Sequence, residues 1–378
     1  MKKRLGDYIK EYSVRNKENQ DIPVYSVTNT EGFCQDYFGK EVASKDKSTY
    51  KIVPQGYFAY NPSRINVGSV DWQRTQERVI VSPLYNVFSV SDKLDQQYLY
   101  YYLKSDFALQ RIKAVATGSV RDNLKLKMLY EFPINIPELS SQKNIVELLD
   151  KIKKIEGVKK AELDYFDTLV KARFVEMFGN PNEINKIANA QIKDVASVKV
   201  GIVIKPTQFY SDDKTGKCAF RSLNIIPFGV KKNSEWVYFT DAAMSENKRT
   251  IVHEGDLLIV RSGNPGTCCV VPREYDGCNV IDLIIAHPDN SKILPEYLCA
   301  FTNMPHGMNQ INNQQHGVAQ RHFNVSMYEK MKLYVPKLSM QHQFVDFMIR
   351  ADKSKVAIQK SLDETQILFQ SLMQKYFG

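Results

Sequence analysis

The sequence lacks the residues that most catalytic centres and metal sites require. All six histidines lie in the second half of the chain, from His253 onward, so a duplicated site built on histidine is excluded. No two histidines have HxH or HxxxH spacing, and the six cysteines include no CxxC pair. A zinc site is therefore not indicated. The cysteines form no disulfide framework either, and we expect reduced thiols that pack as small apolar side chains.

Three enzyme motifs are also missing. There is no GxxxxGK[ST] phosphate-binding loop. A DNA methyltransferase would need a glycine-rich methyl-donor loop and an Asn/Asp-Pro-Pro-Tyr/Phe tetrad, but each Asn-Pro here is followed by Ser63, Asn182 or Gly266. The Pro288-Asp289 pair is not followed by the Asp/Glu-x-Lys of a metal-dependent nuclease. The sequence therefore shows no catalytic constellation of its own.

Long apolar runs are absent too. No segment approaches the ~20 apolar residues that a membrane helix needs, and Asp7 and Lys10 interrupt any signal-peptide core. We therefore expect a cytoplasmic protein without a membrane association. Its 378 residues, 43% of them hydrophobic, suffice for two domains with separate cores. The net charge of +9 favours a polyanionic partner such as nucleic acid.

The chain does contain an internal repeat. Gly56 and Gly255 are 199 residues apart (255 − 56 = 199), as are Tyr98 and Tyr297, Gly118 and Gly317, and Pro137 and Pro336. One offset held over more than a hundred residues predicts two copies of one unit. Ahead of this region Asp7 pairs with Asp194 at an offset of 187, so the second copy has about twelve extra residues.

Each copy ends in a long amphipathic run. Apolar residues recur every three or four positions from Ile145 to Met177 and again from Phe344 to Tyr376, which is typical of a helix with one apolar face. Ser140 and Ser339 are the expected N-caps, and a separate segment from 95 to 115 is also predicted to be helical. At 1.5 Å per residue, a helix of about 38 residues spans ~57 Å, longer than a small domain is wide. Its apolar face therefore needs a partner, and we expect an antiparallel pair; the alternative is that each helix packs only on its own domain.

These observations predict an α+β protein with an internal pseudo-two-fold repeat, in which two similar mixed α/β domains are separated by two long antiparallel helices that form a coiled-coil spacer. The expected boundaries are residues 1–139 for the first domain, 140–179 for the central helix, 180–338 for the second domain and 339–378 for the C-terminal helix.

The two copies share glycine-led polar loops. Glycine allows the backbone to approach a ligand closely, and Arg, Gln and Asn are the side chains that form paired hydrogen bonds with guanine and adenine edges. The predicted DNA-binding residues in these loops are Tyr60, Asn61, Arg64, Asn66, Gly118, Arg121, Asn123, Arg261, Asn264, Gly317, Gln320 and Arg321. Candidate phosphate contacts, equally compatible with ordinary surface charge, are Arg74, Arg78, Arg221, Lys231 and Lys232.

At these residues the chain resembles the specificity (S) subunit of type I restriction-modification systems. The matching segments are the loop from Gly56 to Gly68, Gly118-x-x-Arg121, the Pro-x-Leu-x-x-Gln junctions at Pro137 and Pro336, and Arg173 to Pro181. The second copy departs from this pattern, with Val260-Arg261-Ser262-Gly263 in place of Tyr-Asn-Pro-Ser and Gln320 in place of Arg121. This difference is consistent with two domains that recognise different bases.

The resemblance implies that each domain is a target recognition domain for one half of a split site in double-stranded DNA. The helices would set the spacing of the half-sites and dock two modification (methyltransferase) subunits, and two restriction (motor-nuclease) subunits would complete the assembly. The chain itself would bind no cofactor and catalyse no reaction, with the methyl donor, ATP and Mg²⁺ held by the partner subunits.

Two other classes of protein remain open from the residues alone. One is the specificity part of a fused or type II restriction-modification enzyme, whose catalytic core would be too divergent to recognise by motif. The other is a coiled-coil scaffold with no role on DNA, which would lack a salt-dependent affinity for it.

Overall fold

The computed structural model describes residues 2–35, 46–116, 123–214, 216–315 and 323–378. The chain divides into two compact units: unit 1 comprises 1–161 and 358–378, and unit 2 comprises 162–357. Each unit therefore contains one domain together with part of each long helix. Within the described residues, no helix carries an apolar stretch long enough to cross a membrane.

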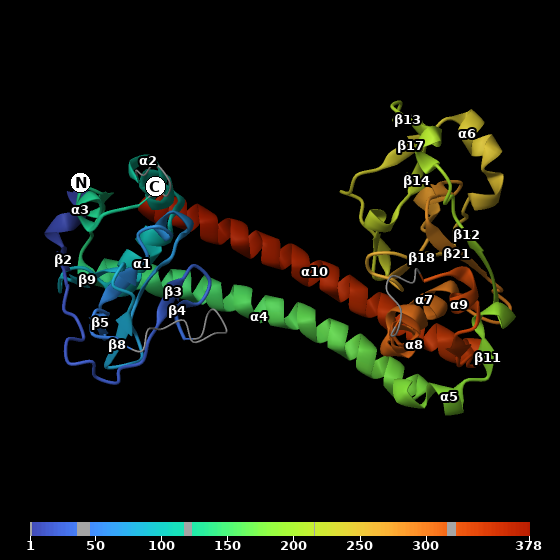
Figure 1. The fold of residues 1–378 in the computed structure, drawn as a ribbon, viewed down its shortest axis with the longest axis horizontal. Helices are drawn as coiled ribbons and strands as arrows, with labels where there is room; N and C mark the ends of the chain where they lie inside the picture. Colours follow the sequence, from blue (N-terminus) through green and yellow to red (C-terminus); the bar gives the residue numbers. More distant parts are fainter. Residues whose placement is uncertain (1, 36–45, 117–122, 215, 316–322) are drawn as a thin grey trace. The chain divides into compact units, whose positions relative to one another are not determined.

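The predicted repeat is present in the secondary structure. Helices α1 (Gln96–Lys104) and α7 (Pro295–Asn303) lie 199 residues apart, and the long helices α4 (Leu139–Phe178) and α10 (Leu338–Phe377) have the same offset and 40 residues each. These bounds agree with the predicted 140–179 and 339–378 to within one residue. Figure 1 shows α4 in green and α10 in red.

The domain of unit 1 is built on a four-stranded antiparallel sheet in the order β2-β9-β6-β7, with helices on one face. Phe58, Phe88 and Leu99 are among the fully buried residues of the core between the sheet and α1. The elements before α4 are β1 (Lys3–Arg4), β2 (Ile9–Glu11), β3 (Ser26–Thr28), β4 (Gly32–Cys34), β5 (Lys51–Pro54), β6 (Phe58–Tyr60), β7 (Val70–Trp72), β8 (Arg78–Val81), β9 (Asn86–Val90), α1, α2 (Asp106–Val115), α3 (Leu126–Tyr130) and β10 (Pro133–Ile134).

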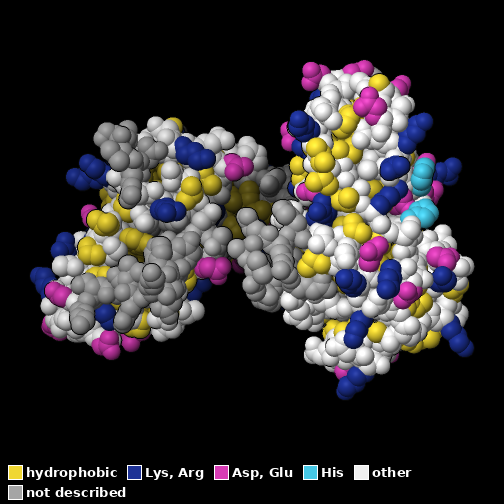
Figure 2. All heavy atoms as spheres, turned by 45° about the vertical axis from the view of Figure 1, so that its right-hand side comes forward, with side chains coloured by type: hydrophobic (Ala, Val, Ile, Leu, Met, Phe, Trp, Pro, Cys, Tyr) yellow, Lys and Arg dark blue, Asp and Glu magenta, His cyan; other side chains and the backbone are white. Residues whose placement is uncertain are grey.

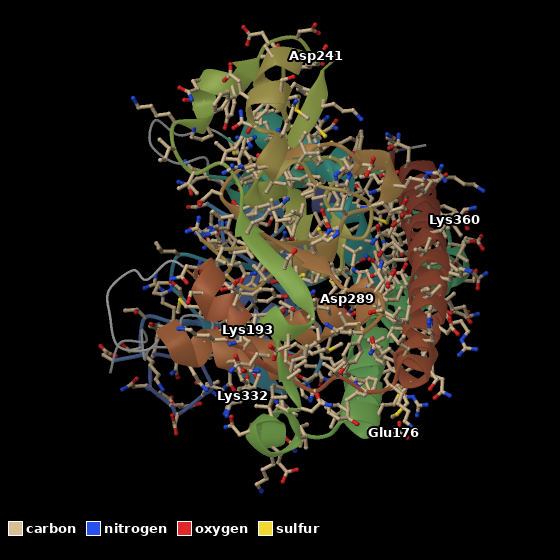
Figure 3. All side chains as sticks on the ribbon, turned by 90° about the vertical axis from the view of Figure 1, so that its right-hand side faces the viewer. Glu176, Lys193, Asp241, Asp289, Lys332 and Lys360 are labelled. Carbon is tan, nitrogen blue, oxygen red and sulfur yellow. The ribbon has the colours of Figure 1, made fainter. Side chains whose placement is uncertain are left out.

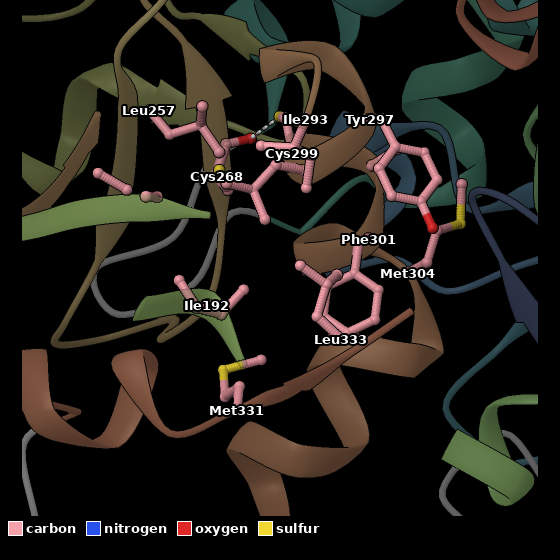
Figure 4. Packing of buried hydrophobic residues seen from close by; sticks show 14 of the residues in the cluster. Ile192, Leu257, Cys268, Ile293, Tyr297, Cys299, Phe301, Met304, Met331 and Leu333 are labelled. Atoms are coloured by element: carbon pink, nitrogen blue, oxygen red, sulfur yellow. Dashed lines mark hydrogen bonds between the residues drawn. The ribbon is translucent and has the colours of Figure 1, made fainter. Parts of the chain in front are cut away.

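The domain of unit 2 repeats this sheet in the order β12-β21-β18-β19. Its strands are β12 (Ala196–Val200), β18 (Leu257–Val260), β19 (Cys268–Val270) and β21 (Leu283–Pro288). On one face Leu257 and Tyr297 belong to a large core, in which Ile192, Phe301 and Leu333 also converge (Figure 4). The other face covers a second apolar cluster that includes Leu258, Val260 and Ile285.

Unit 2 has a second sheet in the order β13-β17-β14-β20, built from strands between β12 and β18 together with β20. The segment between β12 and β18 also contains a short helix, α6 (Asp241–Glu246), and the extra residues of the second copy. Figure 3 shows Asp241 toward one end of unit 2 and Lys193 and Lys332 toward the other. The remaining elements of unit 2 are α5 (Ile184–Ile187), β11 (Ala190–Gln191), β13 (Tyr210–Ser211), β14 (Lys217–Phe220), β15 (Ile225–Ile226), β16 (Gly229–Val230), β17 (Val237–Phe239), β20 (Asn279–Val280), α8 (Pro305–Gln315), α9 (Val325–Glu329) and β22 (Lys332–Leu333).

The Pro-x-Leu-x-x-Gln junction ties each long helix to its own domain through a buried glutamine. Gln142 accepts a hydrogen bond from the Asp95 backbone N–H (2.9 Å) and donates to the carbonyl oxygens of Lys93 (2.9 Å) and Pro137 (2.8 Å). Gln341 makes the same three bonds, to Leu294, Lys292 and Pro336. A primary amide suits this position because it can donate and accept at once.

In both units the two long helices run antiparallel to each other. In unit 1, Lys159 Nζ donates to Ser361 Oγ and Thr365 Oγ1, both at 2.7 Å, and the Lys153 ammonium lies 4.3 Å from the centroid of the Phe369 ring. In unit 2, Lys355 pairs with Asp167 at 2.6 Å. The predicted helix pair is therefore confirmed, and packing of each helix only on its own domain is excluded.

The C-terminal end of each long helix packs into a domain core through an aromatic residue. Phe178 of α4 lies 5.0 Å from the Tyr297 ring in unit 2, and Phe377 of α10 lies 5.0 Å from the Tyr98 ring in unit 1 (centroid distances). Both phenylalanines are at least 96% buried. The phenylalanine at the end of each repeat is therefore part of a domain core. The core of unit 1 contains residues from the first repeat and from the end of α10.

The predicted helix from 95 to 115 is divided in two. Ser105 ends α1 with extended backbone (φ −70°, ψ 150°) and caps α2 by accepting a hydrogen bond from the Ala108 N–H. A serine that bonds the backbone of a new helix competes with continuation of the first. The spacing of apolar residues continues from α1 through Ser105 into α2. For this reason the sequence pattern predicted a single helix.

We predict that Gln142→Leu lowers the free energy of unfolding by about 2–4 kcal/mol, because three backbone groups lose the hydrogen bonds that they make to this buried side chain. Urea denaturation measures this, with the exposed neighbour Lys143→Leu as control, expected to change it by less than ~0.5 kcal/mol. Equal effects of the two substitutions would contradict a specific role for the amide.

Glu156 gives unit 1 a predictable pH dependence. Burial raises the pKa of this carboxyl, but hydrogen bonds from Lys160 and Lys153 outweigh burial and lower it from 4.5 to about 2. Because the pKa is lower in the folded state, the stabilisation is present above pH 4.5 and is lost as the pH falls toward 2.

Glu156→Gln should therefore cost on the order of 1–2 kcal/mol at pH 7, and the gap to the unsubstituted protein should narrow below about pH 4.5. Denaturation curves from pH 7 to pH 3.5 measure this. Glu147→Gln, at an exposed ion pair with Lys151, is the control. A gap that does not change with pH would refute the assignment.

Candidate nucleic-acid interface

In unit 1 the predicted loops meet at one edge of the central sheet. There β6 ends at Tyr60, β9 begins at Asn86 and β7 begins at Val70, and these three residues are paired across the strands. We call this the loop edge of unit 1. Residues 61–68 leave β6 at this edge, and the chain returns to it at Asn123 and Leu124.

Hydrogen bonds join the two predicted loops of unit 1. Ser63 Oγ donates to Asn123 Oδ1 (2.6 Å), and the Leu124 N–H donates to the carbonyl oxygen of Pro62 (3.1 Å). Asn61 Oδ1 accepts from the Ser63 N–H (3.0 Å), which fixes the start of the turn. Arg64 and Asn123 are exposed, and Asn61 and Asn66 are partly buried. The loops thus form one polar surface.

Tyr60 supports this surface from beneath. Its side chain is fully buried, and its hydroxyl donates to the carbonyl oxygen of Leu124 (3.0 Å). Burial raises the pKa of the Tyr60 hydroxyl well above its usual value, so it remains a neutral donor. The prediction that Tyr60 itself contacts DNA does not fit a side chain without exposed surface; it positions the loops instead.

Unit 2 has a corresponding loop edge, where β12 ends at Val200, β18 ends at Val260, β19 begins at Cys268 and β21 begins at Leu283. Arg261 leaves β18 at this edge. Its guanidinium pairs with Asp282 (2.6 Å) and donates from Nε to the carbonyl oxygen of Phe323 (3.2 Å), and its side chain is only 15% exposed. Arg261 therefore braces the edge.

The turn after Arg261 presents its next polar residue to solvent. Asn264 is exposed, while its carbonyl oxygen accepts hydrogen bonds from Thr267 N–H (3.3 Å) and Thr267 Oγ1 (2.9 Å). The amide side chain of Asn264 thus occupies the part of the edge that corresponds to the Asn61–Asn66 turn of unit 1.

Two predicted phosphate contacts lie away from the loop edge. Arg74 follows the far end of β7, where it pairs with Asp71 (2.7 Å) and its guanidinium carbon lies 4.5 Å from the centroid of the Trp72 ring. Arg78 is exposed and pairs with Pro54 at the start of β8, again toward the far edge. The structure does not bring these two residues together with the loops.

Arg221, by contrast, lies beside the loop edge of unit 2. It follows β14, whose last residue, Phe220, accepts a backbone hydrogen bond from Ile281. Its guanidinium donates to the Glu235 carbonyl oxygen (3.0 Å) and its side chain is 23% exposed. Lys231 and Lys232, ten and eleven residues further on, are exposed, and Lys232 pairs with Glu274 (2.9 Å).

The remaining predicted residues lie outside the described part of the chain and stay predictions. They are Gly118, Arg121, Gly317, Gln320 and Arg321. The described neighbours of these segments, Asn123 in unit 1 and Phe323 in unit 2, both contact a loop-edge residue.

The structure adds apolar residues to the loop edge of unit 2 that sequence analysis missed. Ile204 is 78% exposed in the segment that follows β12, and Phe228 is 45% exposed at the tip of the β15–β16 hairpin. Both stand in apolar runs, Ile202-Val203-Ile204 and Ile225-Ile226-Pro227-Phe228, which are typical of buried strands. The adjacent Pro227 was the only local signal for a turn.

Charge alone does not locate the interface. On the face shown in Figure 2, Lys and Arg side chains are scattered over unit 2 among apolar and acidic ones. Among the described residues, no three His, Cys, Asp or Glu side chains are placed to bind one metal ion. Each loop edge presents hydrogen-bonding side chains held by the ends of sheet strands. Such an edge is suited to binding the surface of another macromolecule.

Comparison with known proteins is consistent with this geometry. The family model described as type I restriction modification DNA specificity domain matches residues 3–165 and 186–366. A Haemophilus influenzae protein named as a type I restriction enzyme specificity subunit is 25% identical over 280 residues, which are 70% of this chain and 66% of that protein. The chain thus matches just under two thirds of that relative's length.

Two solved structures share the fold over the whole chain. One, from a study of complex assembly and conformational transition of the type I R-M system, has a TM-score of 0.67 at 14% identity and is covered over 97% of its length. The other, the S subunit of a type I restriction-modification system from M. genitalium, has a TM-score of 0.56 at 13% identity, with 96% covered.

The bracing role of Arg261 is testable. Arg261→Lys keeps the charge but loses the geometry that reaches Asp282 and Phe323 together, so we expect the free energy of unfolding to fall by about 1–2 kcal/mol. Urea denaturation measures it, with Arg273→Lys, an exposed arginine of the same unit, as the unaffected control. An unchanged free energy of unfolding in Arg261→Lys would mean that the contacts with Asp282 and Phe323 do not stabilise the loop edge.

Proposed function

The chain belongs to the type I restriction modification DNA specificity family, and we propose that its two domains recognise the two halves of one split DNA site. The observation that carries this is the repeated loop edge: the same strand ends hold hydrogen-bonding side chains in both units, and those side chains differ. Arg64 and Asn123 are exposed in unit 1 and Asn264 in unit 2. Such side chains distinguish bases in the major groove.

The long helices supply the second part of the proposal. The two helices have 40 residues each and contact each other in both units; on this proposal their length sets the number of unspecified base pairs between the half-sites. The same helices have exposed side chains for partner docking, including Tyr165 and Ile367, 62% and 65% exposed. We assign this surface to two modification subunits, with two restriction subunits completing the assembly.

The chemistry is assigned to the partners. The sequence contains neither a methyl-donor loop nor a phosphate-binding loop. On this proposal the chain acts in the cytoplasm as a non-catalytic DNA-recognition subunit, and the methyl donor, ATP and Mg²⁺ are bound by the other subunits. A fused enzyme with its own activity is the alternative.

Methylation mapping in cells that carry the chain and its modification subunits tests the split site. Arg64→Ala should relax recognition or reduce methylation about 10-fold or more at one half-site only, since one lost base contact costs ~1–3 kcal/mol. Asn264→Ala should do the same at the other half-site. Lys93→Ala, an exposed charge at the far edge of the unit 1 sheet, is the control and should change neither.

Equal changes at both half-sites in either variant would contradict the assignment of one half-site to each unit. The purified chain alone, incubated with DNA and either methyl donor or Mg²⁺, should neither methylate nor cut. Activity of the isolated chain would favour the fused-enzyme alternative.

A further inference from the structure

The β15–β16 hairpin of unit 2 ends in an exposed apolar tip. Ile226 pairs with Gly229, so Pro227 and Phe228 form the two-residue turn between them. Phe228 has a φ of +65°, the conformation that the third residue of a type II turn requires and that glycine or asparagine usually supplies. A bulky residue in this conformation is strained. Phe228 is nevertheless 45% exposed and Ile226 43% exposed, so packing does not explain the tip.

The hairpin tip lies at the loop edge. The Phe228 N–H donates to the carbonyl oxygen of Cys268 (3.0 Å), the residue with which β19 begins. Cys268 directly follows the turn that presents Asn264. The apolar tip and the polar turn therefore belong to one surface.

Unit 1 has the same hairpin with a different tip. β3–β4 lies against β7 as β15–β16 lies against β19. In both units the chain just before the hairpin pairs in parallel with the strand that leads to the centre of the sheet: Val24 with Ile80 of β8, and Ala219 with Asn279 of β20.

The tip of the β3–β4 hairpin consists of Asn29, Thr30 and Glu31, all exposed and polar. Lys104 Nζ donates to the carbonyl oxygen of Asn29 (3.0 Å) and to its Oδ1 (3.1 Å). The shared scaffold therefore folds with a polar tip, and the apolar Pro227-Phe228 is particular to the second copy.

The surroundings of Phe228 suit a polyanion. Arg221 precedes the hairpin, and Lys231 and Lys232 follow it, both exposed. Arg221 lies 3.6 Å from the Glu235 carboxylate and Lys232 pairs with Glu274 (2.9 Å), so these three cations face two acidic partners and keep a net positive charge. An apolar tip flanked by cations is the combination with which proteins enter a DNA groove, in which Phe, Ile or Pro unstacks a base step while Lys and Arg contact the phosphates. The family to which the chain belongs, and the polar turn of Asn264 on the same surface, favour DNA over a membrane or a docking protein as the occupant.

We propose that Phe228, at the tip of the β15–β16 hairpin, is a wedge that stacks on a base step of DNA in the half-site bound by unit 2, whereas the polar tip of unit 1 inserts no side chain. This inference rests on the proposed function. It predicts that the two half-sites are distorted unequally, although the two domains share one fold.

The test uses the full chain assembled with its modification subunits on a duplex that carries the mapped site, with 2-aminopurine placed at successive positions in each half-site. Unstacking raises the fluorescence of this base. The modification subunits extrude the adenine that they methylate, so the methylated positions are left out of the comparison. At the other positions we expect a rise at one step of the unit 2 half-site and none in the unit 1 half-site, which serves as the internal reference.

The variant Phe228→Gly distinguishes an effect on DNA binding from an effect on folding. Glycine accepts a positive φ, so the melting temperature should stay the same or rise, whereas the affinity for the specific duplex should fall about 10- to 100-fold, as for loss of one stacked base. The fluorescence rise should disappear. The salt dependence of binding should not change, because no phosphate contact is removed. Phe228→Trp should restore both affinity and fluorescence.

Unchanged affinity and fluorescence in Phe228→Gly, with normal methylation of the split site, would overturn the wedge and leave the proposed function standing. The wedge would also be overturned if Phe228→Gly kept its DNA affinity but lost self-association in sedimentation or binding to anionic vesicles. The first result would assign the tip to contact with a second copy of the chain, and the second to a membrane surface. Absence of sequence-specific binding in the unsubstituted assembly would instead refute the proposed function itself.

Discussion

Insertion of a helix end into each domain core is the interaction on which the rest of the structure depends. Phe178 enters the core of unit 2 and Phe377 enters the core of unit 1, each against a buried tyrosine of the first helix after the central sheet. A buried aromatic contributes a large apolar area and, in edge-to-face contact, about 0.5–1.5 kcal/mol more. Because Phe377 ends α10, the core of unit 1 is completed only when this helix packs against it.

Buried glutamines hold the opposite ends of the same helices. Gln142 and Gln341 each bind three backbone groups of the domain that precedes the helix. Each domain is thus attached to one helix through a polar joint at the helix start and to the other through an aromatic joint at the helix end. Loops at the sheet edge can vary on this framework, because none of these contacts involves them.

The loop edges show how one scaffold presents two different surfaces. In unit 1, Tyr60 supports the loops from the core, and in unit 2 Arg261 braces them through Asp282 and Phe323. The side chains exposed at corresponding positions of the two loop edges differ. The hairpin tips differ too, since Asn29–Glu31 of unit 1 is polar and Pro227–Phe228 of unit 2 is apolar. On the proposed function, two domains of one fold would make chemically different contacts with their half-sites.

The sequence by itself indicated the duplication and the two long helices, because a constant offset and a periodic apolar face can both be counted along the chain. It did not reveal the break at Ser105, where one side-chain hydrogen bond overrides a continuous apolar pattern. It also did not distinguish an exposed apolar turn from a buried strand at Ile225–Phe228, since burial depends on which elements pack together. Only the tertiary structure showed that Tyr60 faces the core, that Arg74 and Arg78 lie away from the loop edge and that Phe228 lies on it. Residues distant in sequence meet at a sheet edge through strand pairing, and the pairing is fixed by the whole core.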